Sequence, residues 1–431
     1  MPSILMGIDA CQETCDSGQS CYFPPMHFNR RSVLMGCLGL AMAFGSGCES
    51  PFLESTAVKL PKIKLPSVTP KVPADGTLIV YIGTYTRRDS EGIYGFRMDL
   101  KTGGLESLGL MAKADNPSFL AINEENDMLY SVNEVGNYEG KKTGSVSSYL
   151  INPGTGELEH LNTHESGGAG PCHLTVDATG RNVLVANYGG GSVAVLPVGE
   201  SGELKAPSSV QQHKGSSINL RRQQEPHAHS INMGPANKYA FAADLGTDQV
   251  LVYRLDSKKG KLTPASPAYA STAKGAGPRH FAFHPSGRFA YVINELHCTV
   301  TAFKYRAGEL TERQTISTLD VPVQLGFSTA EVQVHPTGRF LYGSNRGHDS
   351  IVVFSIDEAS GRLNRLQVQS TLGTTPRNFG IDPTGNYLIA ANQNSDNLVV
   401  FRIDSESGKL SPTGVEVECP TPVCVKFMQI D

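Results

Sequence analysis

A repeat of about fifty residues runs through most of this 431-residue chain and constrains its fold more than any other feature. Each unit has an alternating strand that begins near a proline, a turn of the type Asp/His-Pro-x-Gly, and a second apolar strand that usually closes on Asn. The anchor residues of the units are Pro117, Pro171, Pro226, Pro278, Thr329, Pro376 and Pro422. Two further short strands complete each unit. Four strands per unit at this period predict the blades of a β-propeller rather than a series of β-sandwiches.

The two ends of the repeat region predict how the ring of blades closes. Residues 78–86 resemble the second strand of a unit without its first, and residues 421–430 resemble a first strand without the rest. We expect these segments to complete one blade together, because closure leaves no sheet edge unpaired. Second strands end at Thr84, Asn133, Asn187, Asp244, Asn294, Asn345 and Asn392. The predicted fold is therefore an all-β, seven-bladed β-propeller over residues 77–431.

Composition agrees with short strands and limits the classes of partner. The chain has 45 Gly, 26 Pro and no Trp, and only 18% of its residues are charged. A net charge of -4, without a block of basic residues, argues against binding to nucleic acid. The cysteines Cys172, Cys298, Cys419 and Cys424 lack a metal-binding spacing, and we expect buried thiols or at most one disulfide.

Residues 1–48 are interpreted as an export signal. Arg30 and Arg31 precede an apolar run from Val33 to Phe44, which is too short to span a bilayer and resembles a twin-arginine leader. Met26 offers a more usual start, so residues 1–25 are read as an over-long extension. The segment FGSGC, which ends at Cys48, resembles a lipoprotein cleavage box and indicates lipidation and a membrane tether, although Gly45 departs from the large aliphatic residue usual three positions before the cysteine. Residues 49–76 read as a Pro/Lys-rich linker. The predicted location is periplasmic or lipid-anchored, with the cytoplasm as the alternative.

Equivalent positions of the seven units should form rings around the channel, because the innermost strand of each blade lines it. One residue after the anchor, the ring contains Ser118, Cys172, His227, Arg279, Ala330, Arg377 and Val423. The next ring contains Phe119, His173, Ala228, His280, Glu331, Asn378 and Cys424. One position past the second strand, Tyr85, Glu134, Tyr188, Leu245, Glu295, Arg346 and Gln393 follow. Polar types differ from blade to blade, which predicts one asymmetric site at the channel mouth. His284 and His335 instead occupy a repeated turn slot and are assigned to turns.

The motifs YIGTYT, GPCH, PHAHS, GPRHFAFHPSGRFAYVINEL and SNRGHDSI together resemble the seven-bladed propeller lactonases, over about residues 78–431. That family includes bacterial 6-phosphogluconolactonases and fungal 3-carboxy-cis,cis-muconate lactonising enzymes. The resemblance implies a site without metal or other cofactor and a small-molecule lactone as substrate. It implicates Glu295, Arg279 and His229 in catalysis. His227, His173, Arg346, His280, Arg377 and Glu331 are the expected substrate-binding residues.

These residue types also suit lactone hydrolysis on chemical grounds. Glu295 can act as general base on water, Arg279 or Arg346 can stabilise an oxyanion, and His227 or His229 can protonate the leaving alkoxide. The chain contains no Gly-x-Ser-x-Gly elbow and no His-Glu-x-x-His motif. Two alternatives remain open here: a cycloisomerase acting on a carboxylated muconate, and a non-enzymatic propeller that binds a ligand or protein. We expect a monomer.

Overall fold

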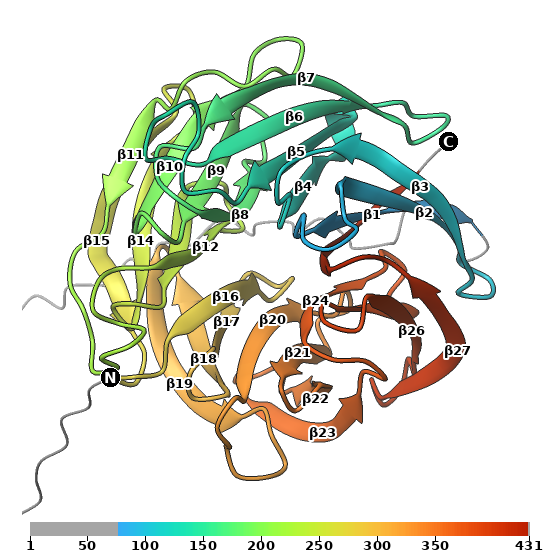
Figure 1. The fold of residues 1–431 in the computed structure, drawn as a ribbon. Helices are drawn as coiled ribbons and strands as arrows, with labels where there is room; N and C mark the ends of the chain where they lie inside the picture. Colours follow the sequence, from blue (N-terminus) through green and yellow to red (C-terminus); the bar gives the residue numbers. More distant parts are fainter. Residues whose placement is uncertain (1–75, 430–431) are drawn as a thin grey trace, which may run out of the picture. The chain divides into compact units, whose positions relative to one another are not determined.

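The computed structural model describes residues 76–429, which form seven four-stranded antiparallel sheets around a central axis (Figure 1). Within these residues the single helical element is one 3₁₀ turn, η1 (Glu124–Asn126), and no helix is long and apolar enough to cross a membrane. The predicted all-β, seven-bladed propeller is confirmed. The predicted export signal (1–48) and all but the last residue of the predicted linker (49–76) lie outside the described residues.

Each sheet is one blade, numbered here in the order of the chain. Blade 1 joins the first and last strands and consists of β28 (Pro422–Gln429), β1 (Thr77–Thr84), β2 (Gly92–Asp99) and β3 (Leu105–Lys113). Blade 2 consists of β4 (Leu120–Asn123), β5 (Met128–Asn133), β6 (Ser145–Ile151) and β7 (Leu158–Glu165). Blade 3 consists of β8 (Pro171–Val176), β9 (Asn182–Asn187), β10 (Ser192–Pro197) and β11 (Ser209–Gln212).

The remaining four blades follow the same order from the inside outward. Blade 4 consists of β12 (Ala228–Met233), β13 (Tyr239–Asp244), β14 (Gln249–Asp256) and β15 (Lys261–Ser271). Blade 5 consists of β16 (Pro278–Phe283), β17 (Phe289–Asn294), β18 (Thr299–Arg306) and β19 (Glu309–Ser317). Blade 6 consists of β20 (Ser328–Val334), β21 (Phe340–Arg346), β22 (Ser350–Ile356) and β23 (Leu363–Ser370). Blade 7 consists of β24 (Pro376–Ile381), β25 (Tyr387–Asn392), β26 (Asn397–Ile403) and β27 (Leu410–Glu418).

The ring closes as the sequence predicts. Strand β28 pairs antiparallel with β1, from Leu78 opposite Gln429 to Thr84 opposite Pro422. In Figure 1 the red C-terminal strand therefore lies in the same sheet as the blue first strand. The backbone groups of β1 that face β28 are paired, so β1 presents no unpaired edge and blade 1 has four strands like the others.

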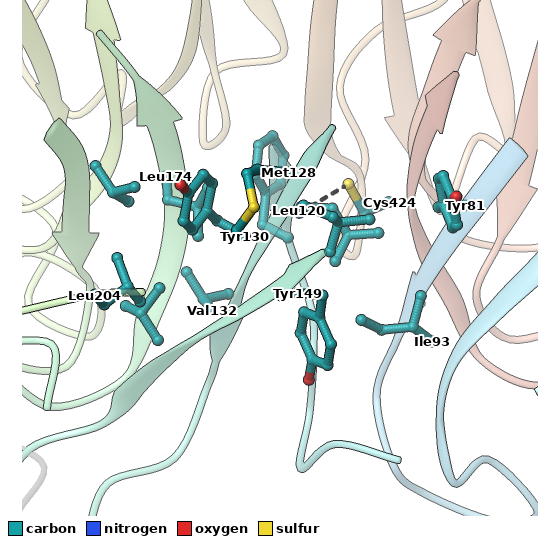
Figure 2. Close-up of a cluster of buried hydrophobic side chains, with 14 of the residues drawn as sticks. Tyr81, Ile93, Leu120, Met128, Tyr130, Val132, Tyr149, Leu174, Leu204 and Cys424 are labelled. Atoms are coloured by element: carbon teal, nitrogen blue, oxygen red, sulfur yellow. Dashed lines mark hydrogen bonds between the residues drawn. The ribbon is translucent and has the colours of Figure 1, made fainter. Parts of the chain in front are cut away.

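Apolar side chains fill the spaces between neighbouring blades. The second strands, such as β9 and β25, are buried along their whole length because a blade covers each of their faces. This is why these strands read as continuous apolar runs instead of alternating ones. Figure 2 shows one such cluster, in which Tyr81, Leu120, Met128 and Leu174 come from three successive blades. The four cysteines of the described residues are buried free thiols. Of the two possibilities that the sequence left open, buried thiols or one disulfide, the first is confirmed.

Polar side chains connect one blade to the next at the turns. The hydroxyl groups of Tyr291 and Tyr342 donate hydrogen bonds to the carbonyls of Gly361 and Gly408, at 3.1 and 2.7 Å. His284 Nε2 lies 2.8 Å from the carbonyl oxygen of Gly338, and His335 makes the same contact to Gly385. The assignment of both histidines to turns is confirmed.

Candidate active site

A β-bulge at the start of the innermost strands aims side chains into the channel. The register shifts by one residue between Pro171 and His173, between Pro278 and His280, and between Pro376 and Asn378. The residue left unpaired at each bulge turns away from the ladder. These residues and their counterparts line one small cavity at the channel mouth: Ser118, Cys172, His229, Arg279, Arg377 and Val423. Five members of the predicted ring line this cavity, and blade 4 contributes His229 in place of the predicted His227.

The structure corrects the predicted register of blade 4. Ala228 pairs with Asp244 as Pro278 pairs with Asn294, so His229 is the counterpart of Arg279, and His227 is not. The alignment of blade 4 on Pro226 was wrong, because Pro226 belongs to the connection before β12 and not to the strand itself. His227 instead lies half-buried at the rim, where its ring stacks on Tyr188 with 4.4 Å between centroids.

Glu295 is the centre of a cluster of three arginines. Its Oε1 accepts a hydrogen bond from Arg222 Nη2 at 2.8 Å. Its Oε2 lies 3.1 Å from Arg279 Nε and 3.0 Å from Arg346 Nη2. Arg279 and Arg346 also donate to the backbone carbonyls of Ala330 and Thr329, which fixes both guanidinium planes. The sequence prediction that Arg279, Arg346 and Glu295 converge is confirmed.

The charges in this cluster fix the protonation state of Glu295. Burial would raise the pKa of its carboxyl group, but Arg346, Arg279 and Arg222 outweigh that effect and lower the pKa to about 2. Burial also lowers the pKa of Arg346 to about 10. At neutral pH the cluster therefore carries one carboxylate among three guanidinium ions, with a surplus of positive charge beside the cavity.

Arg377 lies on another part of the cavity wall and has its own partners. Its Nη2 lies 2.9 Å from the hydroxyl oxygen of Tyr85, and its guanidinium group lies over the Tyr85 ring at 5.2 Å. The Tyr85 hydroxyl donates to Glu134 Oε2 at 2.9 Å, and Ser118 Oγ donates to the same oxygen at 2.5 Å. Arg279 and Arg377 thus line one cavity, but Glu295 holds Arg279 directly, whereas Arg377 is held by Tyr85.

His229 is buried between the two groups. Its Nε2 lies 3.9 Å from Glu295 Oε2, and its Nδ1 lies 3.6 Å from the Cys172 sulfur. Burial, followed by the positive charges of Arg279, His280 and Arg377, lowers the pKa of His229 well below its ordinary value. The imidazole is therefore neutral at pH 7 and can accept a proton.

His173, His280 and Glu331 lie one layer deeper in the channel. The His280 ring meets His173 and His229 edge to face, at centroid distances of 5.2 and 5.6 Å, and His173 stacks on Phe119. His280 Nδ1 lies 3.1 Å from Glu331 Oε1. All three predicted residues also line a cavity of about 590 Å³ on the far side of this layer. His280 borders both cavities, whereas His173 and Glu331 contact the deeper one.

Arg222 is the functional candidate that sequence reasoning missed. It lies in the connection between β11 and β12, which has no counterpart in the other units, so the repeat gave no signal for it. Its side chain is 40% exposed and bridges Glu295 and the Tyr188 hydroxyl group. Tyr85 and Glu134 occupy ring positions that the alignment identifies, but their residue types alone did not distinguish them from structural residues. Among residues 76–429 no group of three His, Cys, Asp or Glu side chains is arranged to hold a metal ion.

The fold is thus a closed seven-bladed propeller with a basic, histidine-containing pocket at one channel mouth. The family model described as Lactonase, 7-bladed beta-propeller matches residues 79–427, and the chain belongs to this family.

Relatives of known name agree with this assignment. The chain is 42% identical to the 6-phosphogluconolactonase of Bacillus subtilis over 295 residues, which cover 68% of this chain and 82% of that protein. It is 35% identical to the 6-phosphogluconolactonase of Formosa agariphila over 296 residues, covering 68% and 83%. The solved structure of the periplasmic gluconolactonase PpgL of Pseudomonas aeruginosa matches with a TM-score of 0.78 at 36% identity, covering 83% of this chain and 100% of that one. These comparisons support lactone hydrolysis and do not favour a cycloisomerase.

Proposed function

We propose that the chain hydrolyses a sugar lactone of the 6-phosphogluconolactonase type to the sugar acid, with the channel-mouth cavity as the active site. The observation that carries this proposal is the pair Arg279 and Arg377, which line one small cavity together with His229. Ester hydrolysis develops negative charge on the carbonyl oxygen. Two fixed guanidinium groups are already in place to stabilise that charge.

Arg279 and Arg377 bind the lactone carbonyl and the oxyanion that forms from it. Each is oriented before substrate arrives, Arg279 by Glu295 and the Ala330 carbonyl, and Arg377 by Tyr85. Loss of a single such donor in other hydrolases costs about 10²–10³ in kcat. Arg346 and Glu295 support Arg279 from behind.

His229, and not Glu295, is the proposed proton acceptor. A carboxylate with a pKa of about 2 is a weak base at pH 7. Burial also lowers the pKa of His229, but its imidazole is neutral at pH 7 and has the Glu295 carboxylate 3.9 Å from Nε2 to stabilise the imidazolium ion as it forms. Water loses a proton to His229, its oxygen attacks the carbonyl carbon, and the C–O bond of the ring breaks. The imidazolium ion then returns the proton to the leaving alkoxide. Glu295, 3.9 Å away, stabilises the imidazolium ion in between.

The direct test is hydrolysis of gluconolactone and its 6-phosphate, with subtraction of spontaneous opening. We expect turnover that falls at least a hundredfold in Arg279→Lys and in His229→Gln, roughly the size of a lost oxyanion donor or general base. Tyr291→Phe, remote from the cavity, is the matched control and keeps full activity. Wild-type protein without turnover on any sugar lactone would favour the alternative of a non-enzymatic binding propeller. Comparison of the two substrates decides whether the lactone is phosphorylated.

The proposal also includes export of the enzyme from the cytoplasm. The similarity to a periplasmic gluconolactonase supports the twin-arginine leader inferred around Arg30 and Arg31. We expect Arg30→Lys with Arg31→Lys to retain the chain in the cytoplasm in cell fractionation. Cys48→Ala is expected to release it from the membrane fraction without loss of export. If the Cys48→Ala variant stays in the membrane fraction, the lipid tether is contradicted. Light scattering of the purified protein tests the expected monomer.

A further inference from the structure

The residue that closes the second strand of a blade makes a repeated contact with the blade before it. Asn187, Asn345 and Asn392 each donate a hydrogen bond from Nδ2, at 3.2 Å, to the carbonyl oxygen of the residue directly after the preceding outer strand. Those carbonyls belong to Ser166, Thr318 and Thr371. The Oδ1 atoms of the same three Asn side chains are buried and have no hydrogen-bond partner among residues 76–429.

Blade 4 replaces this contact with a pair of ionisable side chains. Asp244 stands in place of the closing Asn, and His213 stands where the other blades have Ser166, Thr318 or Thr371. His213 Nδ1 lies 2.6 Å from Asp244 Oδ2, and both side chains are completely buried. A carboxylate only accepts hydrogen bonds, so the imidazole donates. In blade 4 the residue that closes the second strand is therefore the acceptor of this hydrogen bond, whereas in the other three blades it is the donor.

The second oxygen of Asp244 has partners that the Asn oxygens of those three blades lack. Asp244 Oδ1 accepts hydrogen bonds from the backbone N–H of His227 and of Thr247, each at 3.0 Å. His213 and His227 are the two ends of the connection between β11 and β12. One buried carboxylate thus holds both ends of residues 213–227, which we call the Arg222 loop.

A second buried aspartate holds the middle of the Arg222 loop. Asp248 accepts hydrogen bonds from Ser217 Oγ at 2.5 Å and from Gln223 Nε2 at 2.7 Å. Gln223 is the neighbour of Arg222, whose Nη2 reaches Glu295 at 2.8 Å. Asp248 also accepts from the backbone N–H of Gly277, two residues before Arg279. The anchors therefore fix the loop relative to the cluster around Glu295.

We propose that His213 and Asp244 are positioning residues that hold the Arg222 loop as a rigid wall of the pocket, on which Arg222 and His227 contact the hydroxyl-rich end of the sugar lactone. The inference rests on the proposed lactonase function for its substrate, but the anchoring itself does not. The Arg222 side chain is 40% exposed at the mouth, and the His227 ring stacks on Tyr188. His227 Nδ1 donates to the Tyr188 carbonyl at 3.1 Å, so Nε2 is the ring nitrogen left for a sugar hydroxyl group. A pre-ordered wall saves the entropy of ordering a long connection when substrate binds.

The experiment compares three variants of the full chain by trypsin cleavage and by kinetics. Asp244→Ala removes the anchor, Asp244→Asn keeps an oxygen that can accept from His227, and Asn392→Ala deletes the equivalent residue of blade 7. Trypsin cuts after Arg221 and Arg222 when the loop opens, and mass spectrometry identifies the fragments. If Asp244→Ala does not fold, the double variant His213→Ala, Asp244→Ala removes both partners and replaces it.

We expect Asp244→Ala to be cut at the loop about tenfold faster and to have a KM raised about tenfold, with kcat changed much less, because uniform substrate binding is what is lost. Asp244→Asn should restore both values. Unchanged cleavage in Asp244→Ala, or equal changes in Asn392→Ala, overturns the inference, since the latter is what a general loss of stability would produce. Absence of lactonase activity in the wild type would defeat the proposed function alone, because the cleavage result judges the loop without substrate.

Discussion

Glu295→Gln tests whether the arginine cluster depends on an ionised carboxylate. The pKa of Glu295 falls from 4.5 to about 2 in the folded protein, which corresponds to about 3 kcal/mol of stability from the ionised form. A depressed acid pKa stabilises the fold above the unfolded-state pKa, and this stability disappears as the pH falls toward the folded-state value. We therefore expect the variant to lose about 3 kcal/mol at pH 7, a cost typical of a broken buried ion pair.

The variant should also lose the pH dependence that Glu295 supplies. Wild-type stability should drop by about 3 kcal/mol more than that of the variant between pH 5 and pH 2. Unfolding in urea can be followed by circular dichroism, since the chain has no Trp for fluorescence. Glu331→Gln is the control for removal of a buried channel carboxylate, because burial raises the pKa of Glu331 instead. Equal stability of Glu295→Gln and wild type at pH 7, with parallel pH curves, would refute the reasoning.

Three further outcomes follow from the site and the ring. Activity of the wild type should fall on the acid side only well below pH 6.5, because burial lowers the pKa of His229. This acid limb of the pH–rate profile should be absent in His229→Gln. An acid limb near pH 6.5 would mean that another group accepts the proton. Arg377→Lys keeps the charge but loses the planar fork over Tyr85, so kcat should fall about 10²-fold in the lactonase assay with little change in melting temperature. Tyr342→Phe removes the hydrogen bond to Gly408 and should lower the free energy of unfolding in urea by about 1 kcal/mol, with kcat unchanged. A change in kcat that exceeds the loss of stability, both expressed as free energies, would contradict a purely structural role for this hydroxyl group.

The charge balance of the pocket suits the change of charge during lactone hydrolysis. A lactone is neutral at its reacting carbonyl and becomes anionic in the transition state. The surplus of positive charge around Arg279, Arg346 and Arg222 therefore favours the transition state over the ground state. Glu295 limits that surplus and keeps the guanidinium groups from repelling each other.

The sequence by itself determined the number of blades, their strand order and the closure of the ring. A single unit cannot bury both faces of its second strand, so the repeat specifies that neighbours stack on both sides. Residue types at equivalent positions also located the mouth and predicted that Arg279, Glu295 and Arg346 belong to one site, whereas His229 was implicated by the family resemblance. Their meeting follows from the geometry of a ring, which brings together positions far apart in the chain.

Only the tertiary structure decided what depends on distance and on irregular segments. Arg222 lies in a connection that has no equivalent in the repeat, so no periodicity indicates that it reaches Glu295. The register of blade 4 is set by the backbone pairing of Ala228 with Asp244. The alignment on the prolines was two residues off there, because it took Pro226 as the first residue of the strand. We propose Glu295 as an electrostatic partner instead of the base, because three guanidinium groups surround it and lower its pKa. Proton affinity is set by such neighbours and by burial, and neither is written in the residue type.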